Sequence, residues 1–111
     1  MQIPRPSEED KARFRALVPD DPRVQVKPMF GNLGAFVNGN MFMGLFGSDI
    51  GIKLASADKA EFGVIDGVGP FGPAERPMGG YLTLPPSMAS ALTNRWIARS
   101  LDHVAAMPPK K

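Results

Sequence analysis

The feature that most constrains the fold is a run of short apolar segments over residues 27–54, separated by turns that contain glycine. Within this run, Asn38-Gly39 is the pair most typical of a two-residue type I′ hairpin turn. Apolar residues on both sides of the pair predict antiparallel strands over residues 33–37 and 40–46. We therefore expect the centre of the chain to form an antiparallel sheet.

Two turns determine which side chains share a face of this sheet. A three-residue turn at Gly47-Ser48-Asp49 would bring Phe46 opposite Ile50, and cross-strand partners project from the same face. One face is then predicted to carry Leu33, Ala35, Val37, Phe42, Phe46, Ile50, Ile52 and Leu54. The opposite face is predicted to carry Gly34, Phe36, Met41, Met43, Leu45, Gly51 and Lys53. Because both faces are apolar, one can pack on helices and the other needs a second cover.

Helices are predicted before and after the sheet. Ser7 is a typical helix cap followed by acidic residues, so a first helix is expected from Ser7 to Val18. Ser56 is predicted to cap a short helix that ends near Phe62, and Ser87 to cap the longest helix. The buried face of that last helix is predicted to contain Thr93, Trp96, Ile97, Ser100, Leu101, Val104 and Met107.

Further strands and a long loop complete the predicted sheet. A strand over residues 24–30 contains Pro28, which cannot donate to a ladder, so this strand is expected either to lie at an edge or to be broken at Pro28. Residues 63–80 are rich in Gly and Pro, and they predict a loop with a short strand near Phe71. A last strand is expected at residues 80–84.

A single α+β domain over residues 1–111 is therefore predicted. It is a two-layer sandwich with helices on one face of an antiparallel sheet, in the order helix, three strands, helix, one or two strands, helix. Hydrophobic residues make up 43% of the chain and charged residues 22%, which excludes a disordered protein. The sequence has no cysteine, so disulfides and thiolate metal sites are excluded. Without a signal peptide or an apolar run of roughly 20 residues, a cytoplasmic protein is expected.

No pattern of residues indicates catalysis. His103 is the only histidine, and its neighbour Asp102 would project about 100° away around a helix, so the two do not form a dyad. A metal site needs several converging ligands, which this sequence does not bring together. Ser48-Asp49 is typical of a turn rather than of a catalytic triad. The chain is therefore predicted to be non-enzymatic, with no cofactor and no metal.

Binding is the function that the residues favour, with a protein partner or a second copy of the chain. The predicted interaction face consists of Phe36, Met41, Met43 and Leu45. Methionine side chains adapt to varied surfaces. A methionine group, formed by Met29, Met41, Met43 and Met78, therefore fits either a binding surface or a second small core under loop 63–80.

Two other kinds of binding stay open. The last helix and the tail carry a basic patch formed by Arg95, Arg99, Lys110 and Lys111. Such a patch could contact nucleic acid, although the net charge is only +2. A pocket between the sheet and loop 63–80 could instead hold a small molecule.

Several of these segments together resemble the TfoX/Sxy N-terminal domain family. They are Lys27-Pro28-Met29-Phe30-Gly31-Asn32-Leu33-Gly34, Val37-Asn38-Gly39-Asn40-Met41, Arg76-Pro77-Met78 and Trp96-Ile97-Ala98-Arg99-Ser100-Leu101 with Pro108-Pro109-Lys110. Asn32 stands where the family signature has its second glycine. The resemblance implies a fold like that of type III secretion chaperones, with three strands between the first two helices. It also implies a place among regulators of natural competence, which act with the cAMP receptor protein at promoters.

Overall fold

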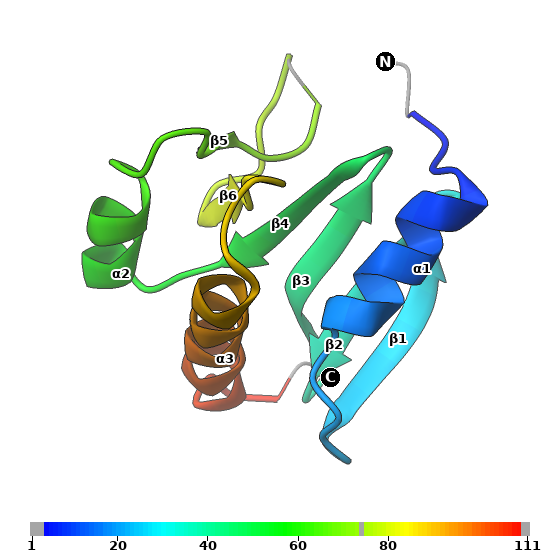
Figure 1. Cartoon of the computed structure of the whole chain (residues 1–111). Helices are drawn as coiled ribbons and strands as arrows, with labels where there is room; N and C mark the ends of the chain where they lie inside the picture. Colours follow the sequence, from blue (N-terminus) through cyan, green and yellow to red (C-terminus); the bar gives the residue numbers. More distant parts are fainter. Residues whose placement is uncertain (1–3, 74, 110–111) are drawn as a thin grey trace.

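The centre of the molecule is one antiparallel sheet. The computed structural model describes residues 4–73 and 75–109, and over these residues it contains three helices and six strands. The elements are α1 (Glu8–Leu17), β1 (Val24–Met29), β2 (Asn32–Val37), β3 (Asn40–Phe46), β4 (Asp49–Lys53), α2 (Ser56–Phe62), β5 (Gly69–Pro70), β6 (Tyr81–Thr83) and α3 (Ser90–Ala105). The strand order is β1-β2-β3-β4-β6-β5, and α1 and α3 lie in front of the sheet in Figure 1. The predicted α+β fold is confirmed.

Among the described elements, four strands precede α2, where three were predicted. Both β1 and β4 pair with the central β2–β3 hairpin, so each belongs to the sheet. The position of β1 at one edge suits Pro28, since a proline cannot donate to a neighbouring strand. The short β5 pairs with β6 at the other edge, next to Phe71, where a short strand was predicted.

Of the three predicted helix caps, only the one at the start of α1 is present. Ser7 Oγ accepts a hydrogen bond from the Asp10 backbone N–H at 3.0 Å, and the Asp10 carboxylate accepts one from the Ser7 N–H at 2.9 Å. The pair forms a capping box, which satisfies two amides at the start of the helix. The described starts of α2 and α3 have alanine at the cap position and no side-chain cap. The predicted caps Ser56 and Ser87 are therefore wrong.

Two-residue turns with positive φ connect β1 to β2 and β2 to β3. Asn38 (φ 54°) and Gly39 (φ 79°) have the left-handed conformation of a type I′ turn, which confirms the predicted hairpin. Phe30 (φ 50°) and Gly31 (φ 81°) form a turn of the same kind. This turn begins one residue earlier than predicted, because β2 already starts at Asn32.

A β-bulge in β3 changes the predicted faces of the sheet. Phe36 pairs with Met41, as the hairpin requires, but Ala35 pairs with Met43. Phe42 is therefore the extra residue of the bulge, and both it and Met43 are buried in the core. A bulge places two residues opposite one, so the alternation of the following side chains is reversed.

The turn between β3 and β4 is one residue shorter than predicted, which reverses the alternation of side chains a second time. Phe46 pairs with Asp49, so this turn has two residues rather than three. The two shifts cancel, and the apolar residues of β4 face the helices as predicted. Three residues of β3 were assigned to the wrong face: Met43 and Leu45, which pack in the core, and Phe46, which lies on the other side.

The bulge receives a hydrogen bond from α3. Ser100 is fully buried, and its hydroxyl donates to the backbone carbonyl of Phe42 at 2.8 Å. A bulge leaves the extra residue without a ladder partner. A buried carbonyl without a donor destabilises a fold by about 1–3 kcal/mol, so this serine holds α3 on the sheet.

The main core lies between the helices and one face of the sheet. Its members from the sheet include Leu33, Ala35, Val37, Phe42, Met43, Leu45, Ile50 and Ile52. Its members from the helices include Phe14, Phe62, Trp96, Ile97, Leu101 and Val104. The buried face of α3 is therefore as predicted, with Met107 partly buried against it. Among the described residues, no helix combines the length and the apolar character needed to cross a membrane.

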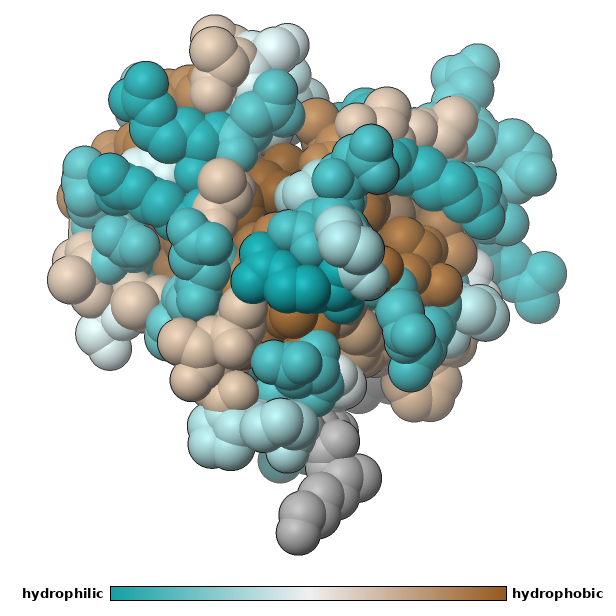
Figure 2. Space-filling model, turned by 90° about the horizontal axis from the view of Figure 1, so that it is seen from below, coloured by the Kyte–Doolittle hydropathy of each residue, from teal (hydrophilic) through white to brown (hydrophobic). Residues whose placement is uncertain are grey.

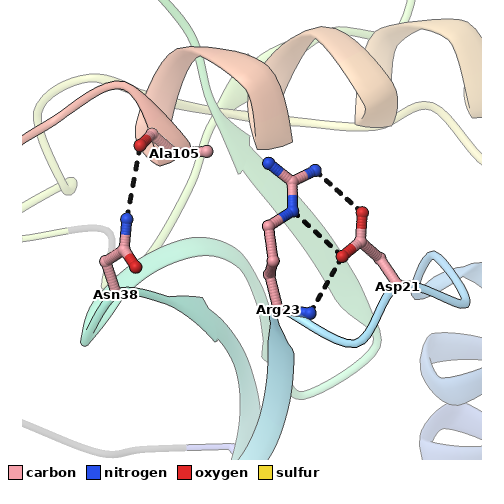
Figure 3. Close-up of polar contacts among 4 residues, drawn as sticks. All are labelled: Asp21, Arg23, Asn38 and Ala105. Carbon is pink, nitrogen blue, oxygen red and sulfur yellow. Dashed lines mark hydrogen bonds and ion pairs between the residues drawn. The ribbon is translucent and has the colours of Figure 1, made fainter.

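Polar side chains form hydrogen bonds at the end of the molecule where α3 ends. The Asn38 side chain donates to the Ala105 carbonyl at 3.3 Å, which ties the β2–β3 turn to α3 (Figure 3). Nearby, Arg23 donates three hydrogen bonds to the Asp21 carboxylate. These hydrogen bonds lower the pKa of Asp21 to about 2. At this end, hydrophilic side chains lie over much of the surface, with hydrophobic surface visible between them (Figure 2).

Candidate functional site: an apolar pocket on the second face of the sheet

An apolar pocket lies on the face of the sheet that the helices leave free. Its volume is about 370 Å³. It is lined by Met29, Phe30, Asn32, Leu33, Met41, Gly44, Leu45, Phe46, Phe71, Pro73 and Met78. These residues come from the β1–β2 turn, from β2 and β3, and from the loop between β5 and β6. Figure 1 shows the β1–β2 turn, the β3–β4 turn and this loop at one end of the sheet.

Glycines form a flat stripe across this face. Gly34 pairs with Gly44, and Gly44 pairs with Gly51, so three neighbouring strands lack side chains at one level. The stripe allows a ring to lie directly on the backbone. A Cβ at Gly51 would lie 2.3 Å from Phe71 Cγ, and Phe71 is only 2% exposed. The sheet therefore needs glycine here to accept Phe71.

The loop after β5 folds down over this stripe. The Met78 backbone N–H donates to the Phe71 carbonyl at 2.8 Å, which closes the loop on itself. The Phe71 ring contacts Phe46 edge-on at 6.3 Å and Tyr81 at 6.1 Å between ring centroids. The loop thus supplies a second small core, and the pocket is the part of this face that the core leaves open.

Tyr81 links this second core to β3. Its hydroxyl donates to the Met41 carbonyl at 2.7 Å, next to the bulge. Burial raises the pKa of Tyr81 to about 12, since the phenolate loses hydration there. The tyrosine is therefore neutral at physiological pH, and its hydroxyl acts as a hydrogen-bond donor that links β6 to β3.

The methionine group is divided between the two layers of the protein. Met29, Met41 and Met78 line the pocket, whereas Met43 is fully buried beneath the helices. The sequence had left open a binding surface or a second core. The second core exists, and three methionines border the cavity beside it. Flexible thioethers allow such a wall to adapt to the shape of an apolar group.

Phe30 stands at the rim of the pocket. It is 77% exposed, and its φ of 50° lies in the left-handed region, which costs about 1–2 kcal/mol for a residue with a Cβ. A large ring that is both exposed and held in a strained conformation does not stabilise the fold of the monomer. Strain of this kind is concentrated at functional sites. The sequence pattern predicted Phe30 inside a strand and so did not mark it as a site residue, although the spacing to the next strand allowed a turn at Phe30-Gly31.

Asn32 is the one clearly polar side chain of the pocket lining, and both of its polar atoms have partners. Its Oδ1 accepts a hydrogen bond from the Gly47 N–H at 2.8 Å, and its Nδ2 donates to the Pro4 carbonyl at 3.1 Å. It is 4% exposed. Asn32 therefore ties the β3–β4 turn and the N-terminal segment to the sheet. The described residues of the lining offer no free polar side chain that could orient a polar ligand.

The four residues of the predicted interaction face lie on opposite sides of the sheet. Phe36 and Met41 pair with each other on the pocket face, and Lys27 Nζ lies 5.3 Å from the Phe36 ring centroid. Met43 and Leu45 are 0% and 3% exposed and belong to the main core. The bulge in β3 separates them, so the four do not form one surface.

The basic patch is also divided. Arg99 forms ion pairs with Asp58 at 3.3 Å and Glu61 at 3.6 Å, and its guanidinium lies over the Trp96 ring. Arg95 is exposed. Lys110 and Lys111 lie outside the described residues. The charge of Arg99 is thus shared with two acidic groups of α2.

The residues that sequence patterns offered for catalysis or metal binding lie apart in the structure. His103 is half-buried, and no group of three or more His, Asp or Glu residues that could hold a metal occurs among residues 4–73 and 75–109. Ser48 lies in the β3–β4 turn, as predicted, where its carbonyl accepts a hydrogen bond from Arg13.

Comparison with known proteins places the chain in one family. A family model for the TfoX N-terminal domain matches residues 12–104, which is most of the 111-residue chain. No curated protein matched the chain, and neither did any solved structure. The chain therefore belongs to the TfoX N-terminal domain family, as the sequence motifs indicated. This family is not known as a family of enzymes.

Proposed function

We propose that this member of the TfoX N-terminal domain family is a non-enzymatic module that binds another protein through its apolar pocket and Phe30. We propose further that it is an accessory to transcriptional regulation of the competence type. Family membership supports the regulatory part, and the pocket supports the binding part. The partner is either another protein or a second copy of the chain. The cytoplasmic location remains a prediction from the sequence.

The observation that carries the proposal is the combination of an open apolar cavity with an exposed aromatic ring at its rim. Protein interfaces are concentrated around such features, where an aromatic anchor fills a pocket and water is excluded. The lining of Met29, Met41, Met78 and Phe71 offers apolar contact on several sides. A partner would therefore insert an apolar side chain into the cavity and cover Phe30 at the same time.

The chemistry of the lining favours a side chain over a polar metabolite. Small-molecule sites place a few polar groups precisely enough to orient their ligand. Here the amide of Asn32 is already used within the fold, so a charged or strongly polar molecule would lose hydrogen bonds to water without replacing them. An apolar side chain carries no such loss.

Nucleic acid is the less favoured partner. Of the predicted basic patch, Arg99 is paired with acidic residues of α2. Phosphate binding depends on free cations and weakens steeply as salt rises. A gel-shift assay with duplex and single-stranded DNA at low salt would reveal this activity, and the protein-binding proposal expects no salt-dependent shift.

The experiment that tests the proposal compares two exposed apolar residues. Phe30→Asn removes the ring from the pocket rim, and Val64→Ser removes a control side chain that is 82% exposed elsewhere. Crosslinking and affinity capture from native cells should recover the same proteins with the wild type and with Val64→Ser, and lose them with Phe30→Asn. Recovery that does not depend on Phe30 would contradict the proposal.

A further inference from the structure

We propose that the group that enters the pocket is Phe30 of a second copy of this chain. In the resulting dimer each copy inserts its ring into the pocket of the other. This inference rests on the proposed function, since it names the partner of the same site. It adds a specific geometry, namely a two-fold interface centred on the β1–β2 turn.

Self-complementarity is the first argument. An interface with two-fold symmetry uses the same surface of both copies, so each surface must contain both halves of the contact. The projecting ring of Phe30 and the cavity lie side by side on one surface here, because Phe30 itself lines the pocket rim. We therefore place the two-fold axis beside the turn, so that each ring faces the cavity of the other copy.

The Phe30 ring does not fill the pocket of its own chain, which is the second argument for a dimer. The positive φ values of Phe30 and Gly31 define a tight turn, and in this conformation 77% of Phe30 stays exposed. The cavity beside it remains open at about 370 Å³. A cavity of about 150 Å³ lined by apolar side chains already binds benzene, so a phenyl ring from outside fits with room for the adjoining turn.

The surface areas involved predict a weak dimer. A buried aromatic side chain removes about 150–250 Å² from water, whereas a stable interface buries about 800 Å² on each partner. The chain exposes 6680 Å², so such an interface would cover a small part of it. Two rings alone fall short of a standard interface, and the surrounding methionines add only part of the difference. We expect association with a dissociation constant on the order of micromolar or weaker.

Sedimentation velocity over a concentration series up to roughly 1 mM, with the whole chain, measures this association. The wild type and Val64→Ser should both shift from monomer to dimer with the same dissociation constant. Phe30→Asn should weaken the dimer by roughly tenfold or more, as loss of an interface anchor does. This variant keeps the turn, because asparagine already occupies the same position of the neighbouring turn as Asn38 and tolerates positive φ.

Photocrosslinking identifies the contact itself. With p-benzoylphenylalanine in place of Phe30 and a mixture of isotopically light and heavy protein, ultraviolet light should produce a covalent dimer. Mass spectrometry should find the crosslinks between chains at Met29, Met41 or Met78, the methionines of the pocket wall. Crosslinks between chains at other surfaces would overturn the inference.

The outcomes separate this inference from the proposed function. A wild type that stays monomeric at roughly 1 mM, or a dimer that Phe30→Asn leaves unchanged, overturns the second copy as the occupant. If a different protein captured from cells still depends on Phe30, the proposed function survives that failure. If a monomer binds a small apolar molecule in the pocket and neither dimer nor protein partner depends on Phe30, both are wrong.

Discussion

Replacement of Gly51 by alanine should displace Phe71 and destabilise the second core. The added Cβ would lie 2.3 Å from Cγ and 2.4 Å from Cδ1 of the ring, whereas ordinary contacts between carbon atoms are about 3.5–4.0 Å. The ring must therefore move by about 1 Å or more, away from the sheet. No backbone strain contributes, since Gly51 is absent from the residues with positive φ.

The size of the effect follows from the packing around Phe71. An extra methyl group in a close-packed region costs about 1–3 kcal/mol. Phe71→Ala removes all three of the atoms nearest to the added methyl group, and alanine then stabilises a strand by roughly 0.5–1 kcal/mol relative to glycine. Phe71→Ala alone should cost about 3–5 kcal/mol, as large aromatic truncations do. The two changes should therefore couple by about 1.5–4 kcal/mol, at the upper end of the values for residues in contact.

Urea unfolding of the wild type, both single variants and the double variant measures this coupling. Gly69→Ala is the matched control, because a Cβ there has no neighbour within 4 Å and should leave the free energy of unfolding unchanged or slightly higher. Equal stability of Gly51→Ala and Gly69→Ala would contradict a steric conflict between residue 51 and the Phe71 ring. So would a cost of Gly51→Ala that is the same with and without Phe71.

Single contacts lead to three further predictions. Phe30→Asn should raise the free energy of unfolding by about 1 kcal/mol, since the strained turn gains a residue suited to positive φ, and a lower urea midpoint would contradict this. Ser100→Ala should cost about 1–3 kcal/mol by leaving the bulge carbonyl without a donor, whereas Ser90→Ala, at the first position of α3, serves as a control with little effect. Tyr81, the only tyrosine, should ionise near pH 12 in the folded protein and near pH 10 in urea, as followed by absorbance at 295 nm. Because its folded pKa is the higher one, its contribution to stability should be complete below pH 10 and should disappear as the pH rises towards 12, and equal titration in both states would contradict this.

Much of the fold could be predicted from local patterns. Asn38-Gly39 specifies a type I′ turn because both residues tolerate positive φ, and Ser7 with Asp10 specifies a helix start through mutual hydrogen bonds. The apolar spacing of α3 is sufficient to identify its buried face, since residues three and four apart share one side of a helix. Pro28 indicated that β1 lies at an edge or is broken, since it lacks the N–H that an inner strand needs.

The candidate site depended on features with no local signal. The bulge at Phe42 moved the side chains of Met43 and Leu45 into the core, so only Phe36 and Met41 of the predicted interaction face still project from the other face of the sheet. No glycine or turn residue marks this bulge. Its partner is Ser100, 58 positions away. A glycine stripe was visible in the sequence, but only the register between strands shows that its members are neighbours.

The sequence by itself determined the types of element, the central hairpin, the buried face of the last helix and the family. These depend on backbone preferences and periodicity within a few residues, which a sequence displays directly. Only the tertiary structure decided which residues of β3 face the helices, how Phe71 packs on Gly51, and where a cavity remains beside Phe30. Those features result from contacts between segments far apart in the chain, where the fit of side chains, rather than local conformation, sets the outcome.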